Sequence, residues 1–191
     1  MDTTTTTTDS KWDRLIRPEY VHGSLYTDEA IFREELEKIW YRTWVYVGHV
    51  SEIPNPNDYV LKTIGLEEVI MTRDREGQIN LLHHRGNRVC VKREGNARSF
   101  TCAYHGWNFG NDGALKGYPY PSGYPDDKRK ELGLGNVARM SIYKGFVFGS
   151  LAADGPTLEE HLGPARAALD NVCANSPEGE IELNTGFLQH K

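Results

Sequence analysis

The chain has 191 residues, of which 38% are hydrophobic, and a formal net charge of -5. This length allows one domain, or one and a fraction, with a hydrophobic core of its own, so no disulfide scaffold is required. The acidic balance argues against a nucleic-acid partner, which needs a basic face. No apolar run approaches the roughly 18 residues that a membrane span requires.

The N-terminus and the cysteines bear on where the protein works. Residues 1–10 are a threonine run with two aspartates. They lack the basic start and apolar stretch of a secretory signal, which predicts a disordered tail. The three cysteines, an odd number without an export signal, indicate a reducing compartment. We therefore expect a cytoplasmic protein in which a cysteine is more useful for metal binding than for a disulfide.

Residues 11–44 are expected to form an N-terminal arm followed by a helix. The segment 11–26 contains Pro18 and is expected to be extended. A helix should start at Thr27, which can cap free backbone N–H groups, with Asp28 and Glu29 at the positive end of the helix dipole. Apolar residues then recur at helical spacing and predict one apolar face: Phe32, Leu36, Ile39, Trp40 and Trp44.

Residues 45–155 read as a succession of short strands separated by turns that carry glycine, proline or asparagine. The predicted strands are 44–50, 59–64, 68–73, 78–82, 89–93, 98–101 and 145–151. Short strands at this spacing predict a mainly β fold, a small antiparallel barrel or sandwich. The proline-rich, charged segment 118–134 is expected to be a long surface excursion.

Residues 156–191 are expected to hold a second helix and a tail. Thr157 and Glu160 fit a Thr-x-x-Glu capping box at the start of a helix that runs to Cys173. The segment 180–187 is a candidate for a last strand.

The residues that carry chemistry lie within 80–117. Cys102 and His105 form a Cys-x-x-His pair, and His84 precedes Cys102 by a stretch that would make a β-hairpin between two ligand loops. Thiolate and imidazole both suit soft or borderline metals, so these three residues are candidate ligands of a shared site. Taken alone, a Cys-x-x-His pair is better explained by a buried cysteine and an exposed histidine than by a metal site.

The motifs of this segment resemble the Rieske segment of aromatic-ring-hydroxylating oxygenase large (alpha) subunits. The resemblance rests on His84-Arg85-Gly86, Cys90, 95–96, 100–107 and Asp112-Gly113. It extends upstream through 25–28, 39–40 and 43–49 to Glu52-Ile53-Pro54, and so covers nearly the whole chain after the tail. It implies a Rieske iron–sulfur fold, with a hairpin-loop cluster subdomain, an N-terminal helix and a C-terminal helix.

The resemblance also implies a cofactor and partners. In that family a [2Fe–2S] cluster lies between a Cys-x-His loop and a Cys-x-x-His loop, with two thiolates on one iron and two imidazoles on the other. Carried over, Cys102 would be a thiolate ligand, and His84 and His105 the imidazole ligands. Electrons would pass from a ferredoxin or reductase through the cluster to a mononuclear non-haem iron, usually in a neighbouring oxygenase subunit.

One ligand of this pattern is missing. The first cysteine should stand two residues before His84, where this chain has Leu82. Either Leu82 replaces that cysteine, or a few residues that carried it have been lost between His83 and His84; the sequence leaves both alternatives open, and either removes the ligand. Cys90 follows His84 on the strand that leads away from the loop, and His83 should point away from the site because neighbours in an extended segment face opposite ways. Neither is expected to replace the thiolate. We therefore expect weak [2Fe–2S] binding or none.

The chain is also shorter than the family pattern. It stops about where the catalytic domain with its mononuclear iron is expected to begin, so catalysis by this chain alone is not expected. Three alternatives to an electron-transfer module remain: a cluster-deficient domain with a structural or interaction role, a mononuclear zinc module on His84, Cys102 and His105, and a stand-alone Rieske ferredoxin.

Overall fold

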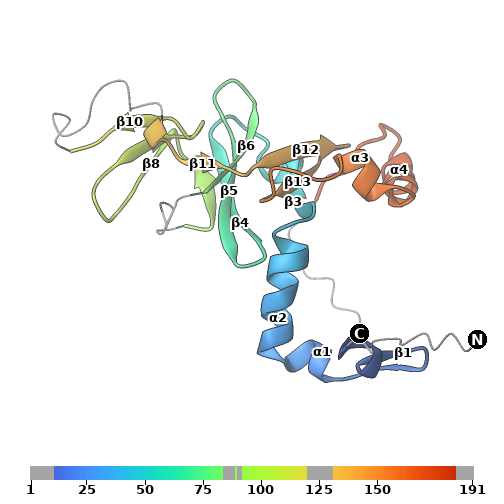
Figure 1. The fold of residues 1–191 in the computed structure, drawn as a ribbon. Coiled ribbons are helices and arrows are strands. Elements are labelled where there is room, and N and C mark those ends of the chain that lie inside the picture. The colour runs from blue at the N-terminus through green and yellow to red at the C-terminus, as the bar shows by residue number, and fades with distance from the viewer. Residues whose placement is uncertain (1–10, 84–88, 90–91, 120–130, 184–191) are drawn as a thin grey trace, which may run out of the picture.

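The computed structural model describes residues 11–83, 89, 92–119 and 131–183 (Figure 1). The predicted tail, 1–10, lies outside them. Most strands belong to three antiparallel sheets, which confirms the mainly β expectation. The described strands form open sheets rather than the closed barrel that was one of the two predicted forms. Within this part of the chain, no helix is long and apolar enough to cross a membrane.

The central sheet has five strands in the order β11-β6-β5-β4-β7. Their bounds are Gly135–Asn136 (β11), Ile79–His83 (β6), Glu67–Arg73 (β5), Asp58–Ile64 (β4) and Glu94–Asn96 (β7). Hairpins join β4 to β5 and β5 to β6, and the register places Ile70 opposite Leu82. The predicted strands 59–64, 68–73 and 78–82 are thereby confirmed to within a residue at each end.

Two three-stranded sheets complete the domain. One has the order β10-β9-β8, with bounds Leu115–Gly117, Asn108–Gly110 and Ser99–Thr101. The other has the order β12-β13-β3, with bounds Arg139–Tyr143, Phe146–Ser150 and Val45–His49. In Figure 1 these sheets lie on opposite sides of the central one. The predicted strands 44–50, 98–101 and 145–151 match β3, β8 and β13, whereas β9, β10 and β12 were not predicted.

The central sheet contributes side chains to two separate hydrophobic cores. On β5, Ile70 belongs to the core shared with β8 and β9, while Val69 and Met71 belong to the core shared with β3 and β13. This division follows from the strand repeat, since successive side chains point to opposite faces. The central sheet is thus buried on both faces.

The N-terminal arm consists of short helical turns and a small hairpin. Its elements are η1 (Lys11–Arg14), β1 (Ile16–Arg17), β2 (Tyr20–Val21), α1 (Ser24–Thr27), α2 (Glu29–Glu35) and the π-helical turn η2 (Leu36–Trp40). Figure 1 shows the arm extending away from the sheets. The main helix begins one residue later than predicted, because Asp28 rather than Thr27 caps it and accepts from the backbone N–H of Ala30 at 2.8 Å.

The apolar face predicted for this helix is only partly buried. Leu36 and Trp44 are buried, whereas Phe32, Ile39 and Trp40 stay exposed. The arm therefore presents apolar side chains that the described part of the chain does not cover.

The C-terminal helix predicted over 157–173 is two helices, α3 (Leu158–Leu162) and α4 (Ala165–Ala174). Gly163, at a φ of 46°, and Pro164 separate them, because proline cannot continue the preceding helix. The capping box is confirmed: Glu160 donates its backbone N–H to Thr157 Oγ1 and accepts from the Thr157 N–H at 2.8 Å.

Four segments remain to be described. A short 3-10 turn, η3 (Val50–Glu52), follows β3. The described residues of 89–93 and of 180–187 are not in strands, so those two predictions are wrong there. The centre of the predicted excursion, 120–130, lies outside the described residues.

Candidate metal centre

Cys102 follows β8 at the start of a tight turn. Its backbone N–H donates to the Trp107 carbonyl at 2.8 Å, and the Gly106 N–H donates back to the Cys102 carbonyl at 2.9 Å. Gly106 has a φ of 70°, which only glycine adopts readily. The Cys-x-x-His pair therefore lies on a short loop closed by its own backbone hydrogen bonds.

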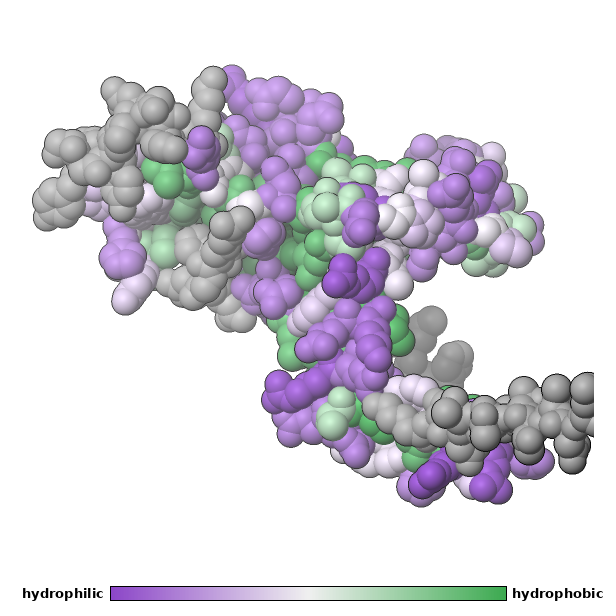
Figure 2. All heavy atoms as spheres, in the orientation of Figure 1, coloured by the Kyte–Doolittle hydropathy of each residue, from purple (hydrophilic) through white to green (hydrophobic). Residues whose placement is uncertain are grey.

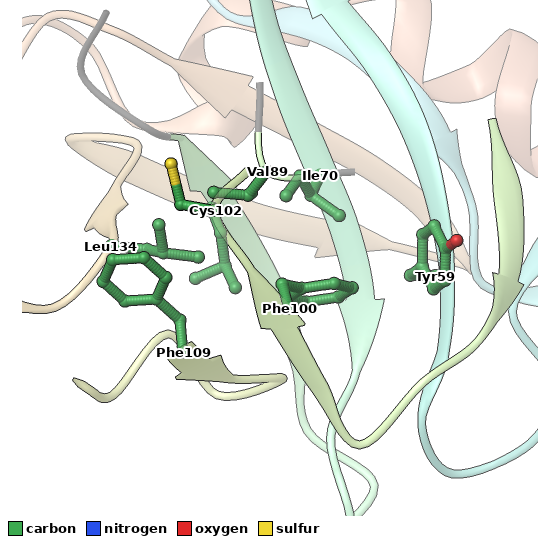
Figure 3. Packing of buried hydrophobic residues seen from close by; sticks show 8 residues of the cluster. Tyr59, Ile70, Val89, Phe100, Cys102, Phe109 and Leu134 are labelled. Atoms are coloured by element: carbon green, nitrogen blue, oxygen red, sulfur yellow. The ribbon is translucent and has the colours of Figure 1, made fainter. Parts of the chain in front are cut away.

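The two members of the pair have different surroundings. The Cys102 side chain is 4% exposed and belongs to the core that includes Phe100, Phe109 and Leu134. Figure 3 shows it beside Val89, with its sulfur turned away from the Phe109 ring. His105, by contrast, is exposed. The loop thus offers one buried thiol and one accessible imidazole.

The aromatic residues of this loop also differ in burial. Trp107 is half-buried, packs against the same core, and lies 5.3 Å from the Tyr118 ring between centroids. Tyr104 is 74% exposed, and its ring centroid lies 3.9 Å from that of His105. Of these two aromatic residues, Trp107 alone packs against the core that contains Cys102.

The second predicted loop is described only up to its first residues. His84 and Cys90 both lie outside the described residues, so the predicted joining of His84 with Cys102 and His105 stays a prediction. Within the described ranges, no three His, Cys, Asp or Glu side chains gather in a way that could hold a metal ion.

Leu82, the residue two positions before His84, lies within the described residues. It lies on β6, is 0% exposed, and belongs to the same hydrophobic core as Cys102. A Cβ placed on Gly113 would come within 2.9 Å of Leu82 Cδ2. The side chain therefore reaches from the central sheet to the turn between β9 and β10.

Two buried polar residues join the same two sheets, and the sequence analysis did not select them. Thr72 on β5 donates its hydroxyl to the Asn111 carbonyl at 2.9 Å. The Asn111 amide in turn donates to the Ala97 carbonyl at 2.9 Å. The adjacent Asp112-Gly113 turn was the one available signal, since a buried side-chain bond across sheets leaves no pattern in the sequence.

The neighbouring Asp112 is a charged group at the edge of this turn. Partial burial pushes the pKa of its carboxyl upward. Hydrogen bonds from the Ala114 N–H and the Lys116 ammonium outweigh that effect, so its pKa lies below the ordinary aspartate value. Asp112 therefore stays ionised and paired at neutral pH.

The described residues do not fit a four-ligand [2Fe–2S] cluster. A Rieske cluster needs two thiolates on one iron, and the residue two positions before His84 is a buried hydrocarbon side chain, Leu82. A leucine has no atom that can coordinate iron. Among the described residues the predicted ligands are the thiol of Cys102 and the imidazole of His105, and His84 stays a prediction from the sequence.

Comparison with known proteins shows which family this chain resembles. Residues 43–134 match the family described as the Rieske [2Fe-2S] domain. The chain is 38% identical over 172 residues to the 2-halobenzoate 1,2-dioxygenase large subunit of Burkholderia cepacia, a match that covers 85% of this chain and 36% of that protein. It is 37% identical over 175 residues to the large oxygenase component of a naphthalene 1,2-dioxygenase system of Ralstonia sp, covering 88% and 38%.

The fold is also similar to those of solved Rieske oxygenase structures. Naphthalene 1,2-dioxygenase from Rhodococcus sp. bound to indole superposes with a TM-score of 0.74 at 35% identity, over 80% of this chain and 36% of that one. A quaternary ammonium Rieske monooxygenase superposes with a TM-score of 0.67 at 27% identity, over 79% and 43%. The chain thus spans well under half the length of these relatives.

Proposed function

We propose, on the premise that residues 43–134 of this chain are a domain of the Rieske [2Fe–2S] family, that the chain serves as the Rieske part of an aromatic-ring-hydroxylating oxygenase large subunit. The observation that carries this proposal is the extent of the likeness. The family domain ends at residue 134, but the match to the dioxygenase large subunits covers 85% to 88% of the chain. The match therefore extends beyond the family domain into at least parts of the chain on both sides of it.

This extent favours a large subunit over a stand-alone Rieske ferredoxin. A ferredoxin needs only the cluster-bearing domain, whereas this chain adds helical segments on both sides of it. The relatives are components of dioxygenases. We therefore propose that the assembled protein is an oxidoreductase. Relay of electrons from a ferredoxin or reductase is the general role of such domains, but no relay step is proposed for this chain, because Leu82 does not fit the cluster.

The arm is the surface we expect to contact the rest of the oxygenase. Phe32, Ile39 and Trp40 are each at least 41% exposed along α2 and η2. An apolar groove beside them is lined in part by Leu25. In the view of Figure 2 most of the arm's surface is hydrophilic, and hydrophobic residues show in small areas between. We propose that this groove is occupied by the part of an oxygenase large subunit that lies outside the segment matched by this chain.

A hybrid subunit tests this function. Residues 11–183 would replace the matching part of the Ralstonia naphthalene dioxygenase large component, and the purified protein would be sized by light scattering. We expect the hybrid to reach the same oligomeric mass as the relative. Recovery of a folded hybrid that stays at the mass of one subunit would contradict the proposal.

A surface variant shows whether the arm makes the contact. Phe32→Glu in the hybrid should reduce assembly, because it places a charge on an apolar contact. It should leave the melting temperature of the isolated chain unchanged, because Phe32 is 42% exposed there. Glu37→Gln, at an exposed position of the same arm, is the matched control and should assemble normally.

A further inference from the structure

We infer that the segment filling the apolar groove of the arm carries an arginine or lysine side chain, and that this cation pairs with the carboxylate of Glu35. The inference rests on the proposed function, which places a part of an oxygenase large subunit in that groove. It adds the chemistry of the occupant, an apolar segment with a basic residue. The two can fail separately, because a segment of any charge would satisfy the proposed function.

The groove lies between the two halves of the arm. Apolar side chains of the β1–β2 hairpin, of α1, and of α2 with η2 line it: Ile16, Val21, Leu25, Phe32 and Ile39. Figure 1 shows α1 and β1 beyond the end of α2 that is far from the sheets. The groove has a volume of about 790 Å³, which is within the range of pockets that take drug-sized molecules. It therefore has room for several side chains of an occupant.

Four carboxylates also line this groove, and three of them already have partners. The Asp28 carboxylate caps the start of α2 by accepting from two backbone N–H groups. Glu29 pairs with Arg33, with 2.5 Å between Oε1 and Nη2. Glu34 pairs with Lys38. The charges of these three residues are therefore already compensated by the arm itself.

Glu35 is the fourth carboxylate of the groove, and it is half-buried at the end of α2. In the part of the chain that the structure describes, its side chain has no hydrogen-bond or ion-pair partner. Phe32 precedes it by three residues and Ile39 follows it by four, and both of these apolar side chains are exposed. Residues at this spacing are neighbours on a helix surface. A contact that covers Phe32 and Ile39 therefore also covers the Glu35 carboxylate.

Covering this carboxylate decides the charge of the occupant. A carboxylate that loses its water without gaining a counter-ion is strongly unfavourable. An apolar occupant without a cation would leave Glu35 in that state, and an acidic occupant would add repulsion. Lysine and arginine fit best, because their long stems can lie along apolar surface while the charged head reaches a carboxylate.

The charge of the groove as a whole agrees with a basic occupant. Its described lining contains the four carboxylates but only one ammonium group, that of Lys38. A hollow lined mainly by one sign of charge attracts groups of the opposite sign. The groove is thus complementary to a segment that is apolar and positively charged.

Hydrogen exchange of α2 and η2 in the hybrid subunit tests the inference. Exchange of their backbone amides, measured by mass spectrometry, would be compared between the hybrid and the isolated 191-residue chain. We expect exchange in the hybrid to be at least about 100-fold slower, because the occupant has to leave before the arm opens. Glu35→Gln should make exchange in the hybrid at least about 10-fold faster, because it leaves the cation of the occupant covered and unpaired.

Three controls separate the charge of Glu35 from its other properties. Glu37→Gln is the matched variant, because Glu37 is exposed on η2 and outside the groove lining; it should exchange like the unaltered hybrid. Glu35→Asp keeps the charge and should retain more protection than Glu35→Gln. In the isolated chain, Glu35→Gln should leave the urea midpoint unchanged, because the carboxylate has no partner there.

The sign of the Glu35→Gln effect is decisive. Slower exchange in that hybrid would overturn the inference, because an occupant without a cation gains when the covered charge is removed; unchanged exchange would overturn it as well. Protection of the arm in the isolated chain that rises with concentration would assign the groove to a second copy, which also contradicts the inference.

The proposed function has a separate readout in the same experiment. A hybrid that assembles and loses protection with Phe32→Glu, but not with Glu35→Gln, would leave the proposed function standing and remove this inference alone. A folded hybrid that neither assembles nor protects the arm would contradict both.

Discussion

Replacing Leu82 by alanine should lower the free energy of unfolding by about 3 kcal/mol, within the range of roughly 2 to 5 kcal/mol measured for leucine-to-alanine changes in protein cores. Leu82 is 0% exposed and belongs to a hydrophobic core to which the central sheet, β8 and β9 all contribute side chains. The β9–β10 turn is fixed by backbone and side-chain hydrogen bonds, so it cannot easily collapse into the space that the missing atoms leave.

Urea unfolding followed by circular dichroism measures this change. A loss of about 3 kcal/mol should move the midpoint by about 1 M or more, given a typical urea dependence of roughly 1 to 3 kcal/mol per M. Leu66→Ala is the control: Leu66 is 65% exposed, so its truncation should cost less than about 0.5 kcal/mol. A loss at Leu82 below about 1 kcal/mol would refute the view that this position belongs to the core.

Three further predictions test neighbouring features. Gly113→Ala should destabilise the chain by about 1 to 3 kcal/mol, because Gly113 has a φ of 81° and a side chain there is strained; an unchanged melting temperature would contradict this. Thr72→Val should cost about 1 to 3 kcal/mol, because it leaves the buried Asn111 carbonyl without its donor; urea unfolding against Thr63→Val, an exposed threonine, checks it. Asp170 accepts from the Tyr143 hydroxyl at 2.6 Å, which with Lys144 holds its pKa below the ordinary value. Because that pKa is lowered in the folded state, the contribution is present at neutral pH and is lost as the pH falls through the folded pKa; hydrogen exchange of α4 should show the loss, and Asp170→Asn should abolish the pH dependence.

Several features of the protein follow from the sequence alone. The capping box at Thr157 and the strands β4, β5 and β6 of the central sheet were predicted from local rules, which depend on side chains close together along the chain. The likeness to Rieske domains also rests on short motifs, and the absence of a cysteine two residues before His84 is visible without a structure. The helix predicted over 157–173 is interrupted at Gly163-Pro164. That interruption also had a signal in the sequence, because proline cannot continue a preceding helix.

Only the tertiary structure decided which face of β6 each leucine takes. Leu81 and Leu82 are consecutive and both apolar, so alternation gives no preference between the two faces of a sheet that is buried on both sides. The β8–β10 sheet packs on one face, and that packing puts Leu82 beside Cys102. The exposure of the arm's apolar face was equally undetermined, because helical spacing predicts a face but not what covers it. The absence of a ligand was thus readable from residue types, but the burial of Leu82 in one core with Cys102 is a property of contacts between distant strands.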